Sequence, residues 1–220
     1  MKDEEEKELS CAECGTLNCH KHESRYPKFC LTTNVDEEML EESLECYKDE
    51  EGIDRKIALA AADIEGEYYG KLTRVEEILA FARRISAKKI GIASCVGLAQ
   101  ESKIFAEILK NNGFDVFMAI CKVGSRDKCE IGLKEEQKIR PNTFEPMCNP
   151  VLQAKYLNKA KTDLNVIMGL CVGHDSLFIK YAKATTTYLV VKDRVLGHNP
   201  VVALYTTGTY YKKLLSPKEY

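Results

Sequence analysis

KIGIASCVGLAQESKIFAEILKNNGFDVFMAIC, residues 89–121, decides the fold of this 220-residue chain. A short apolar run at 90–94 is followed by apolar residues at helical spacing over 104–109. The turn formers Asn111-Asn112-Gly113 then lead into a second apolar run at 114–120. A strand, a helix and a second strand in this order are typical of a βαβ unit, so the stretch predicts a parallel sheet.

The same alternation continues toward the end of the chain. Further strands are predicted at 164–170 and 187–191, with a helix containing residues 177–181 between them. We therefore expect an α/β domain over residues 87–220, with a Rossmann-like or flavodoxin-like parallel sheet. The stretch 122–146 shows no clear periodicity, and a loop of that length inside a compact domain is usually functional or mobile.

The N-terminal side of this domain is organised differently. Residues 36–86 contain three helical patterns, of which the second spans 53–68, and we expect them to form a helical connector. Thr73 and Glu76 have the spacing of a capping box and predict the start of the third helix. Residues 1–35 are rich in cysteine, histidine and turn formers, which predicts a small Cys-rich knuckle that needs metal to fold.

The composition indicates a reducing compartment. No apolar run reaches membrane-spanning length, and the first residues, MKDEEEKE, are too charged for a signal peptide. We therefore expect a cytoplasmic protein without a membrane partner. Ten cysteines in the cytosol indicate metal ligands or reactive thiols, because cytosolic reductants keep structural disulfides rare.

The net charge of −2 hides an asymmetry along the chain. Residues 1–51 carry 6 Lys/Arg against 16 Asp/Glu, whereas residues 52–220 carry 26 against 18. A positive body can hold a small anionic ligand. The basic residues are scattered, there is no Trp, and no recognition helix or RNA-binding platform is visible, so no nucleic-acid partner is expected.

The first group of cysteines lies in the knuckle. A Cys-x2-Cys pair brings two sulfurs to one point, and two further thiolates complete a tetrahedral shell around a metal ion. The spacing predicts a closed, structural zinc-type site, with an iron–sulfur centre as the alternative because it also uses four thiolates. The predicted ligands are Cys11, Cys14, Cys19 and Cys30, with His20 and His22 as competitors.

The second group emerges when the strand ends are compared. Cys95, Cys121 and Cys171 each follow a predicted strand, and a glycine comes two or three residues after each of them. The carboxyl ends of parallel strands form the edge of a sheet where ligands bind, and adjacent strands lie about 4.8 Å apart. Thiols from these ends can therefore reach one ion or cluster.

Two similar tetrapeptides add further residues to this group. Cys148-Asn-Pro-Val and His198-Asn-Pro-Val place Asn at a helix N-cap and Pro at the first helical position. A thiol just before a helix is stabilised as thiolate, which suits a ligand or a nucleophile. His174 comes three residues after Cys171, which places it at the same edge of the predicted sheet. Cys46 and Cys129 belong to neither group and are interpreted as incidental.

We thus predict a metal-binding protein with a zinc-type site in the knuckle and a second metal or iron–sulfur site at the strand ends. The alternative is a thiol-dependent or redox enzyme that acts on a small anion, with Cys171 or Cys148 as the nucleophile, His174 as its base and Arg194 as an anion-binding residue. Nucleotide binding is disfavoured, because no G-x-G-x-x-G or P-loop follows a strand. The second site comprises Cys95, Cys121, Cys148 and Cys171, with His174 and His198 as alternative ligands or acid–base groups.

The same motifs are similar to a known family. They are Cys-Val-Gly-Leu at 95–98, MCNPVLQA at 147–154, GLCVGHDSLFIK at 169–180 and KDRVLGHNP at 192–200. Together they resemble the domain of unknown function 1847 family, from Cys11 to about Tyr211. Members of that family are described as uncharacterised metal-binding proteins, and the resemblance implies metal binding at the N-terminal cysteines 11, 14, 19 and 30. It implies no reaction or substrate.

Overall fold

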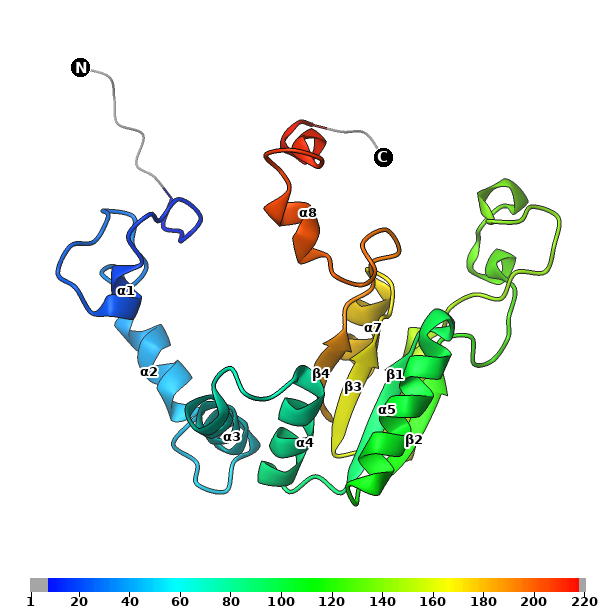
Figure 1. The fold of residues 1–220 in the computed structure, drawn as a ribbon, viewed down its shortest axis with the longest axis horizontal. Helices are drawn as coiled ribbons and strands as arrows, with labels where there is room; N and C mark the ends of the chain where they lie inside the picture. Colours follow the sequence, from blue (N-terminus) through cyan, green and yellow to red (C-terminus); the bar gives the residue numbers. More distant parts are fainter. Residues whose placement is uncertain (1–7, 218–220) are drawn as a thin grey trace. The chain divides into compact units, whose positions relative to one another are not determined.

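The computed structural model describes residues 8–217 (Figure 1). The chain divides into two compact units, one that ends at Ala62 and one that begins at Asp63. Each unit is described by itself. No helix in the described part of the chain combines the length and the hydrophobicity that crossing a bilayer requires.

The first unit begins with loops that carry the N-terminal cysteines. Its helices are α1 (Asn18–Lys21), α2 (Glu37–Glu45) and the first half of α3 (Ile53–Tyr68). The side chain of Asp36 caps α2, because it accepts a hydrogen bond from the backbone N–H of Met39 at 3.1 Å. The predicted Cys-rich N-terminus is therefore present as a loop segment that leads into helices.

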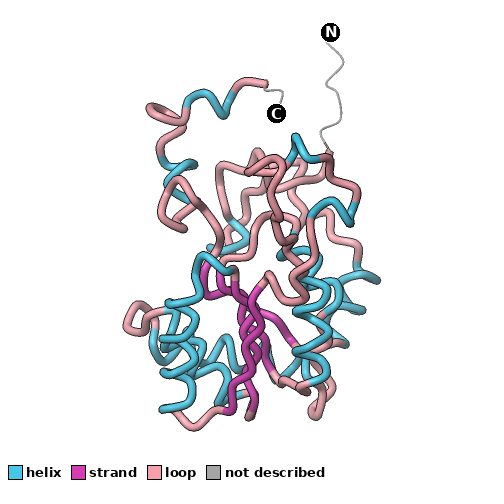
Figure 2. The backbone as a smooth tube through the Cα atoms, turned by 90° about the vertical axis from the view of Figure 1, so that its right-hand side faces the viewer, coloured by secondary structure: helices cyan, strands magenta, loops and turns pink. Residues whose placement is uncertain are grey.

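The second unit is built on a parallel sheet of four strands in the order β2-β1-β3-β4. Figure 2 shows the sheet with helices beside it. The prediction of an α/β fold with a parallel sheet is confirmed. The strands are β1 (Lys89–Ser94), β2 (Asp115–Ile120), β3 (Leu164–Met168) and β4 (Thr185–Val190).

The strand order decides on which face each helix lies. The connection from β1 to β2 runs in one direction across the sheet, and the connections from β2 to β3 and from β3 to β4 run in the other. Right-handed crossovers then place the first connecting helix on one face and the next two on the opposite face. The helices of this unit are α4 (Arg74–Arg84), α5 (Ala99–Asn111), α6 (Pro150–Lys159), α7 (His174–Tyr181) and α8 (Val201–Tyr205).

Short 3₁₀ helices fill several of the connections. One follows β1 directly, two lie between β2 and α6, and one lies near the C-terminus; they are η1 (Val96–Leu98), η2 (Lys128–Ile131), η3 (Glu135–Gln137) and η4 (Lys212–Leu215).

The core lies along the two central strands. All five residues of β3 are buried, and five of the six residues of β1 are buried. Continuous burial is expected of strands covered on both faces. The predicted capping box is also confirmed, because Thr73 N–H donates to Glu76 Oε2 at 2.7 Å at the start of α4.

The third and fourth strands have other bounds than the sequence-based prediction gave them. The third strand ends at Met168 instead of residue 170, because Gly169 turns the backbone with a φ of +63°. A Cβ at this position would lie 2.2 Å from Leu98 Cδ1, so only glycine fits the turn. The fourth strand spans Thr185–Val190 rather than 187–191, and its additional threonines are β-branched residues suited to a strand.

Candidate metal centre at the strand ends

The backbone places Cys95 and Cys121 at the same edge of the sheet. Cys95 follows β1, and its N–H donates to Met168 O at 3.0 Å. Cys121 follows β2, and its N–H donates to Ser94 O at 2.8 Å. Both residues therefore continue the hydrogen-bond ladder by one step. We call the loops that follow the strands and carry Cys95, Cys121, Cys148 and Cys171 the rim.

Cys148 reaches the rim from a different segment. The N–H of Asn149 donates to Cys121 O at 2.7 Å, which holds the two cysteine-bearing segments together. The Asn149 side chain also caps α6 by accepting from Leu152 N–H at 2.9 Å, and Pro150 lies in the first turn. The predicted start of α6 is thus confirmed. The corresponding Asn199 makes no side-chain cap, and α8 begins after Pro200.

Cys121 contacts two of the other rim thiols, although no three rim ligand atoms lie within 4.8 Å of one another in the described chain. Cys121 and Cys148 have their sulfur atoms 3.8 Å apart, and the thiol of Cys121 also hydrogen-bonds to that of Cys95. The backbone N–H of Val96 donates to Cys121 Sγ at 3.3 Å. Cys121 is only 2% exposed and lies in the middle of the trio. A metal ion bound to all three sulfurs can take the place of the hydrogen bonds that join the central sulfur to a neighbour on each side.

The trio shares its protons unequally. Hydrogen bonds from Cys121 lower the pKa of both Cys95 and Cys148 against the opposing effect of burial. Lys192 contributes further to the lowering at Cys95, and Lys122 contributes at Cys148. The pKa of Cys121 is raised by its hydrogen bonds with the two flanking thiols and by burial. The two outer residues are therefore prepared as thiolates, the form that binds metal.

His174 lies near Cys148 and has a side-chain atom that lacks a partner. Its Nδ1 atom is buried and has no hydrogen-bond partner, and the charge of its imidazole lowers the pKa of Cys148. Buried polar atoms are rarely left unsatisfied, so this nitrogen fits a ligand. His174 is the first residue of α7, where its N–H donates to Cys171 O at 2.9 Å.

Cys171 and His198 have other contacts. Arg194 Nη2 donates to Cys171 Sγ at 2.9 Å, so this thiol is paired with a cation from the loop after β4. His198 Nδ1 accepts from Asp193 N–H at 3.1 Å, and His198 N–H donates to Asp193 O at 2.9 Å. His198 therefore closes the loop that carries Arg194.

The N-terminal cysteines show a different pattern. Hydrogen bonds from the backbone N–H groups of Leu17 and Thr16 lower the pKa of Cys14. Burial opposes ionisation of Cys30, but N–H groups at residues 32 and 33 outweigh it, so its pKa is also lowered. Backbone donors to sulfur suit thiolate ligands. No three ligand atoms of cysteines 11, 14, 19 and 30 lie within 4.8 Å of one another in the described chain.

The described chain has one group of three ligand atoms within 4.8 Å of one another, and it lies elsewhere, at Asp127, Cys129 and Glu135. Lys138 already occupies its centre, because its Nζ bonds to Asp127 Oδ1 and Glu135 Oε1, each at 2.8 Å. The Lys138 side chain is 3% exposed. The group is thus an ion-pair core within the segment before Cys148, and sequence spacing carried no signal for it.

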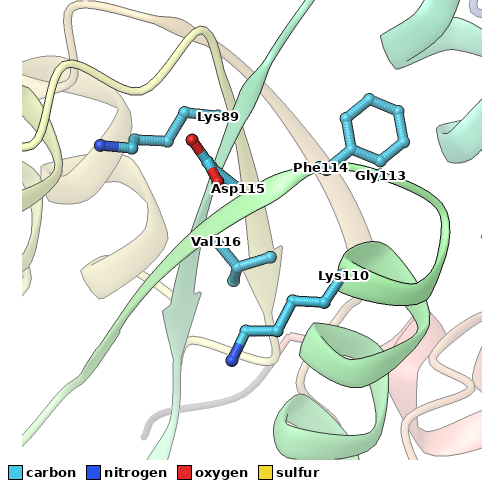
Figure 3. A pocket seen from close by; sticks show the side chains of 6 residues that line it. All are labelled: Lys89, Lys110, Gly113, Phe114, Asp115 and Val116. Atoms are coloured by element: carbon cyan, nitrogen blue, oxygen red, sulfur yellow. The ribbon is translucent and has the colours of Figure 1, made fainter.

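A surface hollow of about 650 Å³ lies at the opposite ends of the strands (Figure 3). No thiol lines it, and its lining includes the two lysines Lys89 and Lys110 (Figure 3). The rim is therefore the better site for chemistry. The hollow is lined by Lys89, Lys110, Gly113, Phe114, Asp115 and Val116.

The family model described as protein of unknown function DUF1847 matches residues 30–189, which is more than half of the chain. The chain belongs to the DUF1847 family. The match includes β1 to β3, all but the last residue of β4, and the rim residues Cys95, Cys121, Cys148 and Cys171, and it begins at Cys30 of the N-terminal group.

Two individual proteins are also similar to the chain. An uncharacterised protein of Methanocaldococcus jannaschii is 46% identical over 210 residues, which cover 96% of this DUF1847 chain and all of that protein. A crystal structure of Dph2 from Pyrococcus horikoshii with a 4Fe-4S cluster is 21% identical and has a TM-score of 0.35. The similarity covers 65% of this chain but only 33% of the Dph2 chain.

Proposed function

We propose that this DUF1847 protein binds a metal ion at the rim, with Cys95, Cys121 and Cys148 as thiolate ligands and His174 as the fourth. The observation that carries the proposal is the spacing of 3.8 Å between the sulfur atoms of Cys121 and Cys148. Zinc–thiolate bonds of 2.3 Å in a tetrahedron separate two sulfurs by about 3.8 Å, so the pair already has the spacing that one ion requires.

The donor set fits a zinc-type ion. Three cysteines and one histidine form a common tetrahedral shell, and the unpartnered Nδ1 of His174 supplies the nitrogen. The bound ion would draw the three thiolates together and displace the proton of Cys121. An iron–sulfur cluster is the alternative occupant, because it also binds thiolates.

A second, structural zinc site in the knuckle belongs to the same proposal. Its ligands would be Cys11, Cys14, Cys19 and Cys30, and the lowered pKa of Cys14 and of Cys30 supports thiolates there. The ion would supply the constraint that closes a loop segment with few helical residues. A cytoplasmic location suits both sites, because free thiols persist in reducing compartments.

Metal analysis of anaerobically purified protein tests the proposal. We expect two zinc ions per chain, and one ion fewer in Cys121→Ser. The matched control is Cys46→Ser, which changes an exposed thiol whose Sγ donates a hydrogen bond to Glu42 O in α2. Loss of one ion from Cys121→Ser but not from the control is the expected result. If the protein contains iron and absorbs visible light, the occupant is an iron–sulfur cluster and not zinc. An unchanged metal content in Cys121→Ser would refute the rim site.

The contact between Arg194 and Cys171 favours a second candidate function. Cys171 would act as a nucleophile on a small anion, with His174 as its base and Arg194 binding the anion. The two functions differ in His174, which is a metal ligand in one and a base in the other. If His174→Gln lowers the metal content, the metal-site reading is supported; if the metal stays and a selective alkylation of Cys171 slows, the enzyme reading is supported.

A further inference from the structure

Two cations of the rim contact sulfur atoms rather than carboxylates. Lys192 hydrogen-bonds to the thiol of Cys95, and Arg194 Nη2 donates to Cys171 Sγ at 2.9 Å. Neither side chain lies within ion-pair distance of a carboxylate in the described part of the chain. The guanidinium of Arg194 carries five N–H donors and the contact with Cys171 uses one of them, so most of its donors remain available to a ligand.

The carboxylates near these cations bond to backbone groups instead. Asp193 lies between Lys192 and Arg194 in sequence, but its Oδ1 accepts from Val195 N–H at 2.8 Å and Leu196 N–H at 2.7 Å. Asp175 likewise accepts from two backbone N–H groups at the start of α7, at 3.0 and 2.8 Å. Neither carboxylate therefore forms an ion pair with Lys192 or Arg194.

The loop that carries both cations is held in a fixed shape. The paired hydrogen bonds between Asp193 and His198 close it, and Gly197 and His198 have left-handed backbone conformations with φ of +60° and +65°. At its start, Lys192 Nζ would lie 3.5 Å from a Cβ at Gly97, so the absence of a side chain there leaves room for the amine.

We propose that Lys192 and Arg194 form a binding site for the oxyanion group of a small molecule, next to the metal ion of the rim. The site rests on the proposed metal centre, because it gives that centre a substrate class. It lies where the loops after β1 and β3 meet, and the helices that follow these two central strands lie on opposite faces of the sheet. Ligands of open α/β sheets bind at this switch point.

The chemistry of the two side chains suits a carboxylate or a phosphate. The planar guanidinium of Arg194 can hold two oxygens at once, and the ammonium of Lys192 adds a point charge. The metal ion would meanwhile bind the sulfur of Cys95, which leaves the donors of Lys192 free for the anion. The arrangement directs the charged end of a small molecule toward the metal without a covalent step.

Calorimetric titration with inorganic phosphate, and separately with acetate, tests the site at constant ionic strength. The protein is the full chain with its metal, and the variants are Lys192→Met and Arg194→Met. Lys103→Met, which removes the same charge from an exposed position of α5, is the matched control. We expect each rim variant to weaken binding at least tenfold, because charged hydrogen bonds of this kind are strong. Tighter binding of phosphate than of acetate would assign a phosphate group, and the reverse a carboxylate.

The outcomes separate this inference from the proposed function. Equal affinities in the rim variants and the control, or no binding of either anion, would refute the anion site. Metal content is measured on the same samples, so a protein without rim metal would refute the metal centre instead. The anion titration of metal-free protein then still shows whether Lys192 and Arg194 bind an oxyanion.

Discussion

Cys121 and Cys148 have sulfur atoms 3.8 Å apart, although 27 residues separate them in the chain. Their backbones are joined as well, because Asn149 N–H donates to Cys121 O at 2.7 Å. A short contact held from both the side chain and the backbone is a preformed pair of ligands. Two of the four proposed rim ligands therefore need little rearrangement to bind an ion, which favours affinity, whereas Cys95 and His174 must approach them.

Alkylation should distinguish the rim thiols in metal-free protein. The pKa of Cys148 is lowered to about 5, mainly by its hydrogen bond with Cys121. A lowered pKa means that thiolate is present above that pH, so the rate of iodoacetamide modification at Cys148 should stay nearly constant from pH 6 to 8. The rate for free cysteine should rise about tenfold per pH unit over this range, since its pKa is about 8.5. Peptide mass spectrometry of quenched samples measures both rates, and a tenfold rise per unit at Cys148 would contradict the prediction.

Gln153 should control the geometry of the trio. This fully buried residue of α6 donates from Nε2 to Ser94 O at 3.1 Å and to Ala119 O at 2.7 Å; Ser94 directly precedes Cys95, and Ala119 lies two residues before Cys121. Gln153→Leu should lower the free energy of unfolding by about 1–3 kcal/mol, because it removes two hydrogen bonds to buried carbonyls.

The same variant should bind cobalt at the rim more weakly, as read from the visible spectrum of the cobalt-substituted protein. Gln100→Leu makes the same change at an exposed position of α5 and should alter neither stability nor spectrum. If Gln153→Leu loses stability but keeps full cobalt affinity, its role is confined to the fold.

Much of this arrangement could be predicted from sequence, because it depends on local patterns. The βαβ alternation predicts the parallel sheet, and the position of Cys95, Cys121 and Cys171 after strands predicts that they share one edge. The division of the four thiols depends on strand order and on side-chain directions. Cys171 pairs with Arg194 instead of joining the trio, and no spacing rule indicates that contact.

The segment before α6 was also beyond sequence reasoning. Its ion pairs join residues at irregular spacing, so no periodicity records them. Lys138 at their centre has a buried side chain, which is unusual for lysine and depends on the carboxylates that surround it. The unpartnered Nδ1 of His174 is similarly a property of the packed molecule, since it requires knowledge of every neighbouring donor.

The turn after β3 should be intolerant of a side chain. Gly169 has a φ of +63°, and a Cβ there would lie 2.2 Å from Leu98 Cδ1. Gly169→Ala should therefore cost about 2 kcal/mol or more, from the left-handed backbone and from the clash. Gly208→Ala, where a Cβ would meet nothing within 4 Å, should leave the melting temperature nearly unchanged. Equal melting temperatures for the two variants, measured by calorimetry, would contradict the assignment of strain to this turn.

The ion pairs around Lys138 should make the segment before Cys148 sensitive to acid. Hydrogen bonds from Lys138, and then from backbone N–H groups, lower the pKa of Asp127. A lowered carboxyl pKa stabilises the folded segment above the usual Asp value near 4, and this stabilisation is lost as the pH falls below that value. Amide hydrogen exchange over residues 125–147 should therefore accelerate between pH 5 and pH 3, after correction for the intrinsic pH dependence of exchange.

Lys138→Met should show the faster exchange already at pH 7, whereas Lys134→Met, which changes an exposed lysine of the same segment, should not. Unchanged protection in Lys138→Met would show that the segment is held by contacts other than this ion-pair core.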